Sequence, residues 1–188
     1  RHYSIGSNKR CMKVKTIILL AFIIILGAFL RFWQIGNVPP SPDWDEVALG
    51  YNAYSIMLTG KDEYGKFLPV VLQSFDDYKP ALYAYMVIPF VKFFGLNIIS
   101  VRLPSVIFGI ITIGVVFLLV KLLIPQNFLL FKNKRIGGDS IALLTALFLA
   151  ISPWHIQFSR VAFEAQVGLA LDLLALVFFF LSFKKKWL

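Results

Sequence analysis

The sequence predicts an all-α integral membrane protein with about four transmembrane helices and amphipathic interfacial helices in a long first external loop. Hydrophobic residues make up 59% of the chain and charged residues 15%, with a mean hydropathy of +0.76. This composition is too apolar for a soluble domain of 188 residues. Four stretches approach the roughly 20 apolar residues that a ~30 Å hydrocarbon core requires. We expect these helices at about 16–33, 103–124, 140–158 and 165–183.

The first apolar stretch follows Met12-Lys13-Val14-Lys15, which resembles the start of a signal peptide. However, the apolar run is long, and Arg31-Phe32-Trp33-Gln34 stands where a small-residue cleavage site should lie. Trp33 is better suited to anchor a helix end at the membrane interface. We therefore expect a retained helix, preceded by a cytoplasmic segment over residues 1–15.

The charges predict the orientation. Basic residues form three clusters: Arg1, Lys9, Arg10, Lys13 and Lys15; Lys132, Lys134 and Arg135; and Lys184, Lys185 and Lys186. Seven of the ten acidic residues lie in one segment: Asp43, Asp45, Glu46, Asp62, Glu63, Asp76 and Asp77. Because basic loops remain cytoplasmic, both termini and the Lys132 loop are expected inside, and a loop over about 35–102 outside, in a multi-pass plasma-membrane protein. This distribution explains the net charge of +9 without a nucleic-acid partner.

Residues 80–96 are apolar and raise the alternative of a fifth span. That span would move the Lys132 loop to the outside, against the charge pattern. The segment is also short, and it contains Pro89 and Lys92 among its aromatic residues. We expect it to be a surface or re-entrant helix at the outer interface.

The external loop is expected to open with an amphipathic helix. Ser41 and Pro42 suit the N-cap and the first helical position, and Gly60 suits the end. Apolar residues between them recur at three- and four-residue spacing, which predicts one stripe along a helix lying on the membrane. The stripe consists of Trp44, Val47, Tyr51, Tyr54 and Leu58.

Two groups in this loop are candidates for chemistry. Asp45 and Glu46 lie in the first helical turn, where the helix dipole keeps carboxylates ionised and available as a base or metal ligand. Acids are also common there simply because they favour the dipole. Asp76 and Asp77 precede Lys79, whose compact charge suits the phosphate of an anionic lipid. The alternative is an ordinary lysine that extends to the interface.

A third candidate lies between the last two apolar stretches. Arg160 and Glu164 are four residues apart and would share a face if the segment were helical. Charges at membrane depth usually line a site or pair with each other, and both readings stay open here. His155 is expected to be structural. Asp172, within the last helix, is expected to face the bundle interior.

Three motifs in this order resemble bacterial and archaeal membrane glycosyltransferases of the GT-C class. They are Trp-Asp-Glu at 44–46, Lys-Pro at 79–80 and Ser-Arg-x-x-x-Glu at 159–164. The family 39-like branch is the most similar. Its members have motifs like Asp-Tyr-Lys-Pro at 77–80 and Ser-Pro-Trp-His-x-x-x-Ser-Arg at 152–160 of this chain. This branch includes dolichyl-phosphate-mannose protein mannosyltransferases, and the aminoarabinose transferases belong to the same class. The resemblance covers about residues 17–183.

The resemblance implies transfer of a sugar from a polyprenyl-phosphate carrier to a protein, glycan or lipid acceptor on the outer face. Asp45 would be the general base or a ligand of a divalent metal ion, with Glu46 in support. Lys79 and Arg160 would bind the carrier phosphate. Glu164 would be a second site acid and metal ligand, and Asp77 a further site acid. Such enzymes contain many more helices. The resemblance therefore also implies that this chain is the N-terminal part of such an enzyme and is inactive alone.

The alternative from another class is a transporter or a lipid-flipping component without enzymatic activity. A transporter should place charges near the midplane of several helices. In this sequence only Asp172 is expected to be deep.

Overall fold

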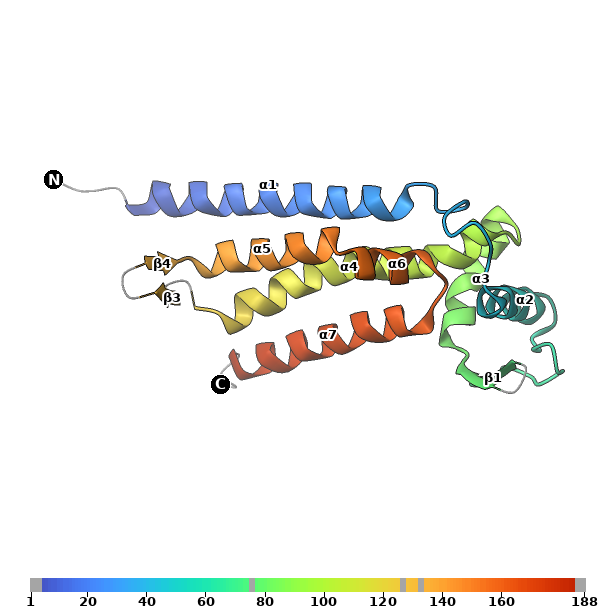
Figure 1. Cartoon of the computed structure of the whole chain (residues 1–188). Coiled ribbons are helices and arrows are strands. Elements are labelled where there is room, and N and C mark those ends of the chain that lie inside the picture. Colours follow the sequence, from blue (N-terminus) through green and yellow to red (C-terminus); the bar gives the residue numbers. More distant parts are fainter. Residues whose placement is uncertain (1–4, 75–76, 126–127, 132–133, 185–188) are drawn as a thin grey trace.

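The computed structural model describes residues 5–74, 77–125, 128–131 and 134–184. Four helices run side by side as an elongated bundle: α1 (Ile5–Phe32), α4 (Ile98–Leu123), α5 (Gly138–Ile151) and α7 (Glu164–Lys184) (Figure 1). Several residues of the predicted charge clusters lie outside the described part: Arg1, Asp76, Lys132, Lys185 and Lys186. The start of α1, the end of α7 and the β3–β4 hairpin (Phe128–Phe131 and Lys134–Ile136) share one end of the bundle.

Within the described residues, three segments are long and apolar enough to cross a membrane. They are Val14–Phe32, Ile98–Leu123 and Glu164–Phe183. A fourth span results only if α5 and the short helix α6 (Pro153–Arg160), which meet at an angle of 57°, are counted together. The predicted all-α membrane protein is thereby confirmed in part: the described chain is mostly helical, with three candidate spans or up to four, and it also contains two short β-hairpins.

The expected continuous helix over 140–158 is wrong, because the chain bends at Ser152. Proline disfavours the α conformation in the residue before it, and Ser152 is extended with φ −61° and ψ 117°. Ser152 then serves as the N-cap of α6, with Pro153 at its start. α4 also begins earlier than expected, at Ile98, since the Asn97 side chain accepts a 3.0 Å hydrogen bond from the Ser100 amide.

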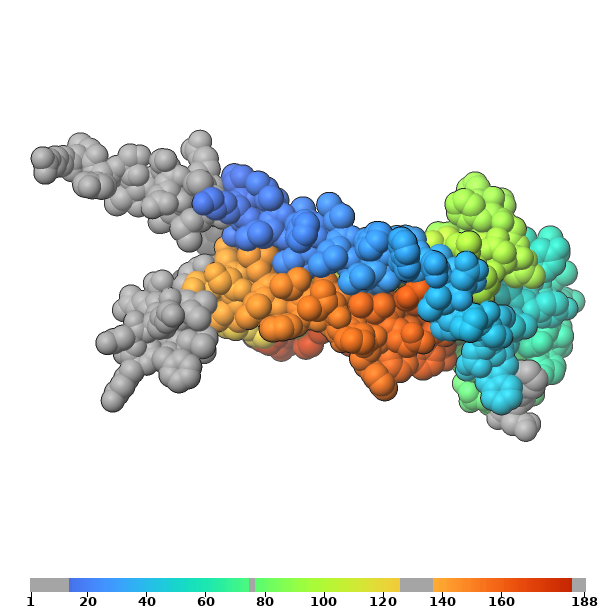
Figure 2. All heavy atoms as spheres, turned by 45° about the horizontal axis from the view of Figure 1, so that its top comes forward, coloured from blue at the N-terminus to red at the C-terminus, as the bar shows by residue number. Residues whose placement is uncertain are grey.

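The bundle core is built from small residues on one side of α5. Ala142, Ala146 and Ala150 are completely buried at four-residue spacing and pack against Ile113 of α4 and Ile23 of α1. Small side chains let helix backbones approach closely, which is typical of helix pairs in membranes. Figure 2 shows α1 lying along α5 on this face of the molecule. Large apolar side chains point outward along the bundle, among them Ile17, Phe22, Phe148 and Phe178.

A separate layer covers the other end of the bundle. It contains α2 (Trp44–Thr59), α3 (Leu82–Phe94) and an antiparallel hairpin of β1 (Val71–Ser74) and β2 (Asp77–Pro80). Both helices run across the direction of the long helices (Figure 1). α3 has 13 residues, too short to span a bilayer at 1.5 Å per residue. We call this layer the cap layer.

α2 begins two residues later than expected. Asp43 is its N-cap and forms a capping box with Glu46, whose carboxylate accepts a 3.2 Å hydrogen bond from the Asp43 amide. Ser41 and Pro42 therefore precede the helix. The end at Gly60 is confirmed, and its φ of 72° is left-handed, a conformation that glycine adopts without strain.

The apolar stripe of α2 does not form its packed face. Its members are exposed: Trp44 70%, Val47 57%, Tyr51 52%, Tyr54 37% and Leu58 62%. The helix instead packs on α3 through Leu49, Ala53 and Ile56. The stripe is thus largely exposed and does not pack on α3.

Candidate functional site

The cap layer brings together two residues that the sequence singled out. Lys79 of β2 donates a hydrogen bond from its ammonium to Oδ1 of Asp45, in the first turn of α2. The Lys79 side chain is 6% exposed and that of Asp45 is 33% exposed. Strand alternation turns Lys79 inward, while its neighbours Tyr78 and Pro80 face outward. A buried ammonium thus meets a carboxylate that solvent and substrates can reach.

Glu46 is held in a second, fully buried ion pair. Its two carboxylate oxygens accept hydrogen bonds from Nε and Nη2 of Arg102, both at 2.8 Å. The Ala162 amide also donates to Oε1, at 2.7 Å. Arg102 in turn donates to the carbonyl oxygen of Ile35 at 2.8 Å. Glu46 therefore joins α2, α4 and the segment before α7.

Arg102 is a site residue that the sequence analysis did not identify. It lies next to the expected start of the second membrane helix and carries no motif. The only signal was a charge at a helix boundary, which also occurs where residues merely anchor a helix at the interface.

The segment from Arg160 to Glu164 is not helical, so the condition for a shared helical face is not met. α6 ends at Arg160 and α7 begins at Glu164, so the intervening turn separates them. Arg160 donates through Nη2 to the carbonyl oxygen of Trp33, at 2.6 Å. Within the described part of the chain, Arg160 Nε and Glu164 Oε2 are both buried without a hydrogen-bond partner. These two atoms are the unsatisfied groups nearest to the turn over 161–163.

The remaining predicted acid, Asp77, is exposed and accepts a hydrogen bond from the Tyr78 amide at 2.7 Å. The described residues include no group of three or more His, Cys, Asp or Glu side chains that would hold a metal ion. The partner of Asp45 is the cation of Lys79, and Glu164 forms no such group with it. The expected divalent metal ion at Asp45 and Glu164 stays a prediction, and the chemical steps below are derived for the side chains of this chain alone.

Tyr83 of α3 is completely enclosed beside these acids. Its hydroxyl donates to the carbonyl oxygen of Val101, at 2.9 Å, and lies 3.2 Å from Oγ of Ser105. Burial raises the pKa of the Tyr83 phenol well above its usual value, and the charges of Glu46 and Glu164 add in the same direction. The phenol therefore stays a neutral hydrogen-bond donor that fixes α3 to α4.

A buried polar network lies deeper in the bundle. The Arg31 guanidinium is fully buried and donates to the carbonyl oxygens of Gly27 at 2.8 Å and Ala150 at 3.1 Å. Its Nη2 lies 2.6 Å from Nδ1 of His155. Since arginine only donates, Nδ1 must accept, which makes Nε2 the protonated nitrogen of a neutral His155. His155 is thus structural, as its place beside Trp154 suggested.

Asp172 faces outward from the described bundle, which contradicts the expectation that it faces the interior. It is exposed near the middle of α7, whereas Ala170 and Val177 of the same helix are buried. Hydrophobic patterning predicts which residues are apolar, but it cannot say which side of a uniformly apolar helix meets its neighbours.

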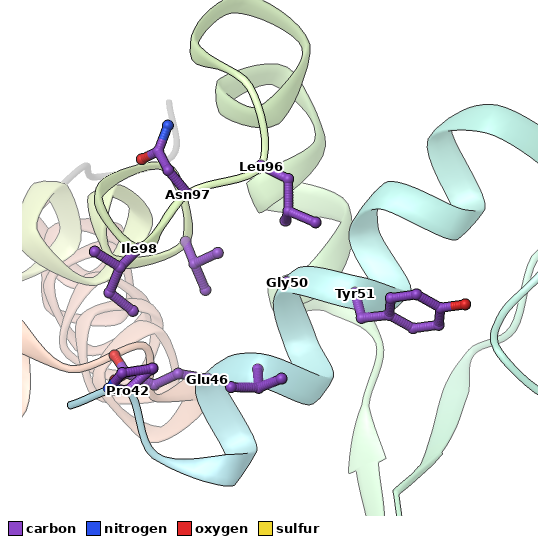
Figure 3. A pocket seen from close by; sticks show the side chains of 9 residues that line it. Pro42, Glu46, Gly50, Tyr51, Leu96, Asn97 and Ile98 are labelled. Atoms are coloured by element: carbon purple, nitrogen blue, oxygen red, sulfur yellow. The ribbon is translucent and has the colours of Figure 1, made fainter.

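Two small pockets flank α2. An apolar groove of about 240 Å³ runs between α2 and the corner where α3 meets α4, with Glu46 at one side (Figure 3). Leu96 and Asn97 of the corner lie across from Gly50 and Tyr51 of α2. Gly50 allows this approach, because a Cβ there would lie 2.8 Å from Val101.

The second pocket, of about 220 Å³, lies against Trp44, Val47, Ala48, Glu63 and Tyr64. The Asn52 amide orders this region, since it donates to Glu63 Oε1 at 2.9 Å and accepts from the Glu63 amide at 3.0 Å. Ala48 and Asn52 follow Asp45 at three and seven positions, so they share one side of α2. The pocket therefore lies at the start of α2, and Trp44 of its lining directly precedes Asp45 in the sequence.

The fold defines a mostly helical membrane protein with an ion-paired cap layer at one end of its bundle. Comparisons with known protein families, with curated proteins and with solved structures find no match to this chain. The resemblance to membrane glycosyltransferases therefore still depends on the three sequence motifs.

Proposed function

We propose that this chain is part of a membrane glycosyltransferase. The enzyme moves a sugar from a polyprenyl-phosphate carrier to a hydroxyl-bearing acceptor at the outer membrane surface. The observation that carries the proposal is the pairing of Asp45 with buried Lys79, from 34 positions apart, at one end of an apolar bundle. Such a reaction needs a base and a phosphate-binding cation, and in this proposal both lie in one site.

The Asp45–Lys79 ion pair suggests how the base and the phosphate-binding cation are held before substrate binds. In the absence of substrate, Lys79 neutralises Asp45. A carrier phosphate would take over the Lys79 ammonium and release the carboxylate. Asp45 then removes the proton of the acceptor hydroxyl as its oxygen bonds to the anomeric carbon of the sugar. The bond from that carbon to the phosphate oxygen breaks, and Lys79 stabilises the departing phosphate charge.

The two pockets support this assignment of substrates. The groove beside Glu46 is lined by apolar side chains and suits an isoprenoid or acyl chain. The pocket at the start of α2 offers the rings of Trp44 and Tyr64 with the carboxylate of Glu63, groups that suit the apolar face and the hydroxyls of a sugar ring. Arg160 and Glu164 act as the second cation and second acid, and a bound substrate would satisfy their unpaired atoms.

Glu46 has a supporting function in this proposal. Its bidentate contact with Arg102 fixes the first turn of α2, and thereby the position of Asp45, without exchanging a proton. Asp77, which is exposed, is a weaker candidate for the site.

The proposal places the cap layer outside the plasma membrane, with α3 along the outer interface and the N-terminus in the cytoplasm. The bundle supports this arrangement, because the basic ends of α1 and α7 lie opposite the cap layer (Figure 1). A cysteine introduced at Gly65 should react with an impermeant reagent from outside, and one at Asn133 should not. The reverse pattern would overturn the orientation.

Lys79 provides the test of carrier binding. The chain, reconstituted in nanodiscs, is titrated with a short-chain prenyl phosphate. Lys79→Ala should raise the Kd at least about tenfold, since a charge-assisted contact contributes about 1.5–3 kcal/mol. Lys92→Ala is the matched control, because Lys92 is an exposed lysine of the same layer. Equal losses in the two variants would point to general attraction of anions and contradict the assignment.

Asp45 provides the test of chemistry in the complete enzyme. Asp45→Asn keeps the size of the side chain but cannot accept a proton, so turnover should fall about 10²–10⁴-fold, or roughly 3–5 kcal/mol of barrier. Asp43→Asn is the control, since asparagine caps helices about as well as aspartate. If both variants lose the same activity, or neither does, Asp45 is not the base.

A transporter or lipid-flipping component is the second candidate. Asp172 favours it, because it places a charge near the middle of a candidate span. Such a protein would bind the prenyl phosphate through Lys79 yet never release a sugar from it.

A further inference from the structure

Asp172 occupies an unusual position on the surface of the bundle. It lies in the candidate span Glu164–Phe183, with about two helical turns or more on either side. α7 packs chiefly against α4, through a face that buries Val167, Ala170 and Val177. Asp172 points from the other side of the helix and is exposed, and α7 forms an edge of the bundle in Figure 1.

A carboxylate at this depth needs a partner that the described residues do not supply. None of them donates a hydrogen bond to Asp172 or forms an ion pair with it. An aspartate turned toward lipid at the centre of a helix is costly, and intramembrane carboxylates usually face other helices and pair with them. The exposed side chain therefore marks a face of α7 that another element covers.

The residues around Asp172 are suited to a helix as that element. Ala165, Gly168 and Ala175 lie on the same side of α7, at spacings of three and four residues, and all are at least partly exposed. A Cβ added at Gly168 would meet nothing within 4 Å, so a neighbouring backbone has room to approach. Small residues around a polar group are typical of contacts between membrane helices.

We propose that this face of α7 binds a transmembrane helix carrying a lysine or arginine at mid-depth, which pairs with Asp172. Charge complementarity selects this occupant. A second copy of the same face would bring two carboxylates together, and like charges in a low-dielectric setting oppose each other. A helix without a cation would leave Asp172 desolvated and unpaired.

The experiment measures association in liposomes by energy transfer. The chain carries a donor dye on its single cysteine. The probe is a leucine-alanine transmembrane peptide with one central lysine and an acceptor dye. The wild-type chain should bind it at least about tenfold more tightly than Asp172→Leu or Asp172→Asn does. A peptide without the lysine should bind all three chains equally weakly.

Two further variants keep the proposal falsifiable. Asp172→Lys should bind a peptide with a central aspartate in place of lysine, which restores the pair with its charges exchanged. Leu173→Asp combined with Asp172→Leu keeps a carboxylate at about the same depth, but position 173 is five residues from Gly168 and two from Ala175 and so lies off the side that they share; this variant should bind like Asp172→Leu. Equal binding by the wild type and Asp172→Leu, or failure of the exchanged pair, would overturn the proposal.

A water-filled surface is the competing explanation for an exposed aspartate. In a Cys11→Ser background, Asp172→Cys should resist a charged, membrane-impermeant thiol reagent. Rapid modification would show that this face lines an aqueous cavity, and the helix-docking proposal would then fail.

Discussion

Glu46→Gln distinguishes a residue that supports the fold from one that takes part in chemistry. The Glu46 carboxylate accepts four hydrogen bonds: two from Arg102 at 2.8 Å, one from the Ala162 amide at 2.7 Å and one from the Asp43 amide at 3.2 Å. Glutamine keeps the shape, but it removes the charge and turns an NH2 group toward one of these donors. Loss of one partner of a buried ion pair costs about 3–5 kcal/mol, because the other charge remains buried.

The assay is thermal unfolding of the detergent-solubilised chain, followed by far-UV circular dichroism. For a chain of this length, 1 kcal/mol corresponds to about 2–4 °C, so Glu46→Gln should lower the Tm by roughly 6–20 °C. The control is Asp139→Asn, which breaks the pair with Lys121. That pair has a 3.0 Å contact and side chains that are 24% and 40% exposed, so its loss should cost only about 0–1 kcal/mol.

Replacing both partners provides a stricter check. The double variant Glu46→Leu with Arg102→Met substitutes apolar side chains for the pair, and buried pairs replaced in this way often lose little stability. It should therefore unfold at a higher temperature than Glu46→Gln alone. Our reasoning is refuted if Glu46→Gln unfolds within a few degrees of the Asp139→Asn control.

Three other predictions concern packing and burial, and the same unfolding assay checks them. Gly109→Ala should cost about 1–3 kcal/mol, because its Cβ would lie 2.4 Å from Cβ of Ser159, while Gly114→Ala, with its nearest neighbour at 4.0 Å, should be neutral or stabilising. Arg31→Lys should cost about 1–3 kcal/mol, since one ammonium cannot replace three contacts in different directions; unchanged stability would show that the network is dispensable. Tyr83→Phe should cost about 1 kcal/mol. Because burial raises the pKa of Tyr83, the unfolded chain releases this proton first, so stability should fall as the pH rises above about 10, and less steeply in Tyr83→Phe.

The long helices were predictable from their apolar runs, because long apolar segments occur chiefly where side chains face lipid or a protein core. Helix starts were less predictable. The same Ser-Pro pair was read as a start at residues 41–42, where Asp43 forms the cap instead, and was overlooked at 152–153, where it does begin α6. The first Ser-Pro pair does not start a helix because Asp43 forms a capping box with Glu46 and so becomes the N-cap in place of Ser41. Residue type alone does not show which of two neighbouring N-cap candidates is used.

The site was predicted as separate residues and not as contacts. Asp45 and Lys79 were both singled out, yet their pairing depends on how the β1–β2 hairpin folds back on α2. The roles of Arg31 and Arg102 could not be predicted, because each resembles an ordinary charge at the end of a membrane helix. Only the tertiary structure shows that Arg31 donates to the carbonyl oxygen of Ala150 in α5 and that Arg102 binds Glu46.

The three-way contact of Glu46 also constrains the order of assembly during synthesis. Glu46 emerges from the ribosome first, Arg102 follows with α4, and the Ala162 amide arrives only after α5 and α6 have been made. The ion pair with Arg102 can form early, but the last hydrogen bond to Glu46 must wait until the segment between α6 and α7 has been made. The cap layer therefore becomes fixed late, and the chain that leads into α7 completes it.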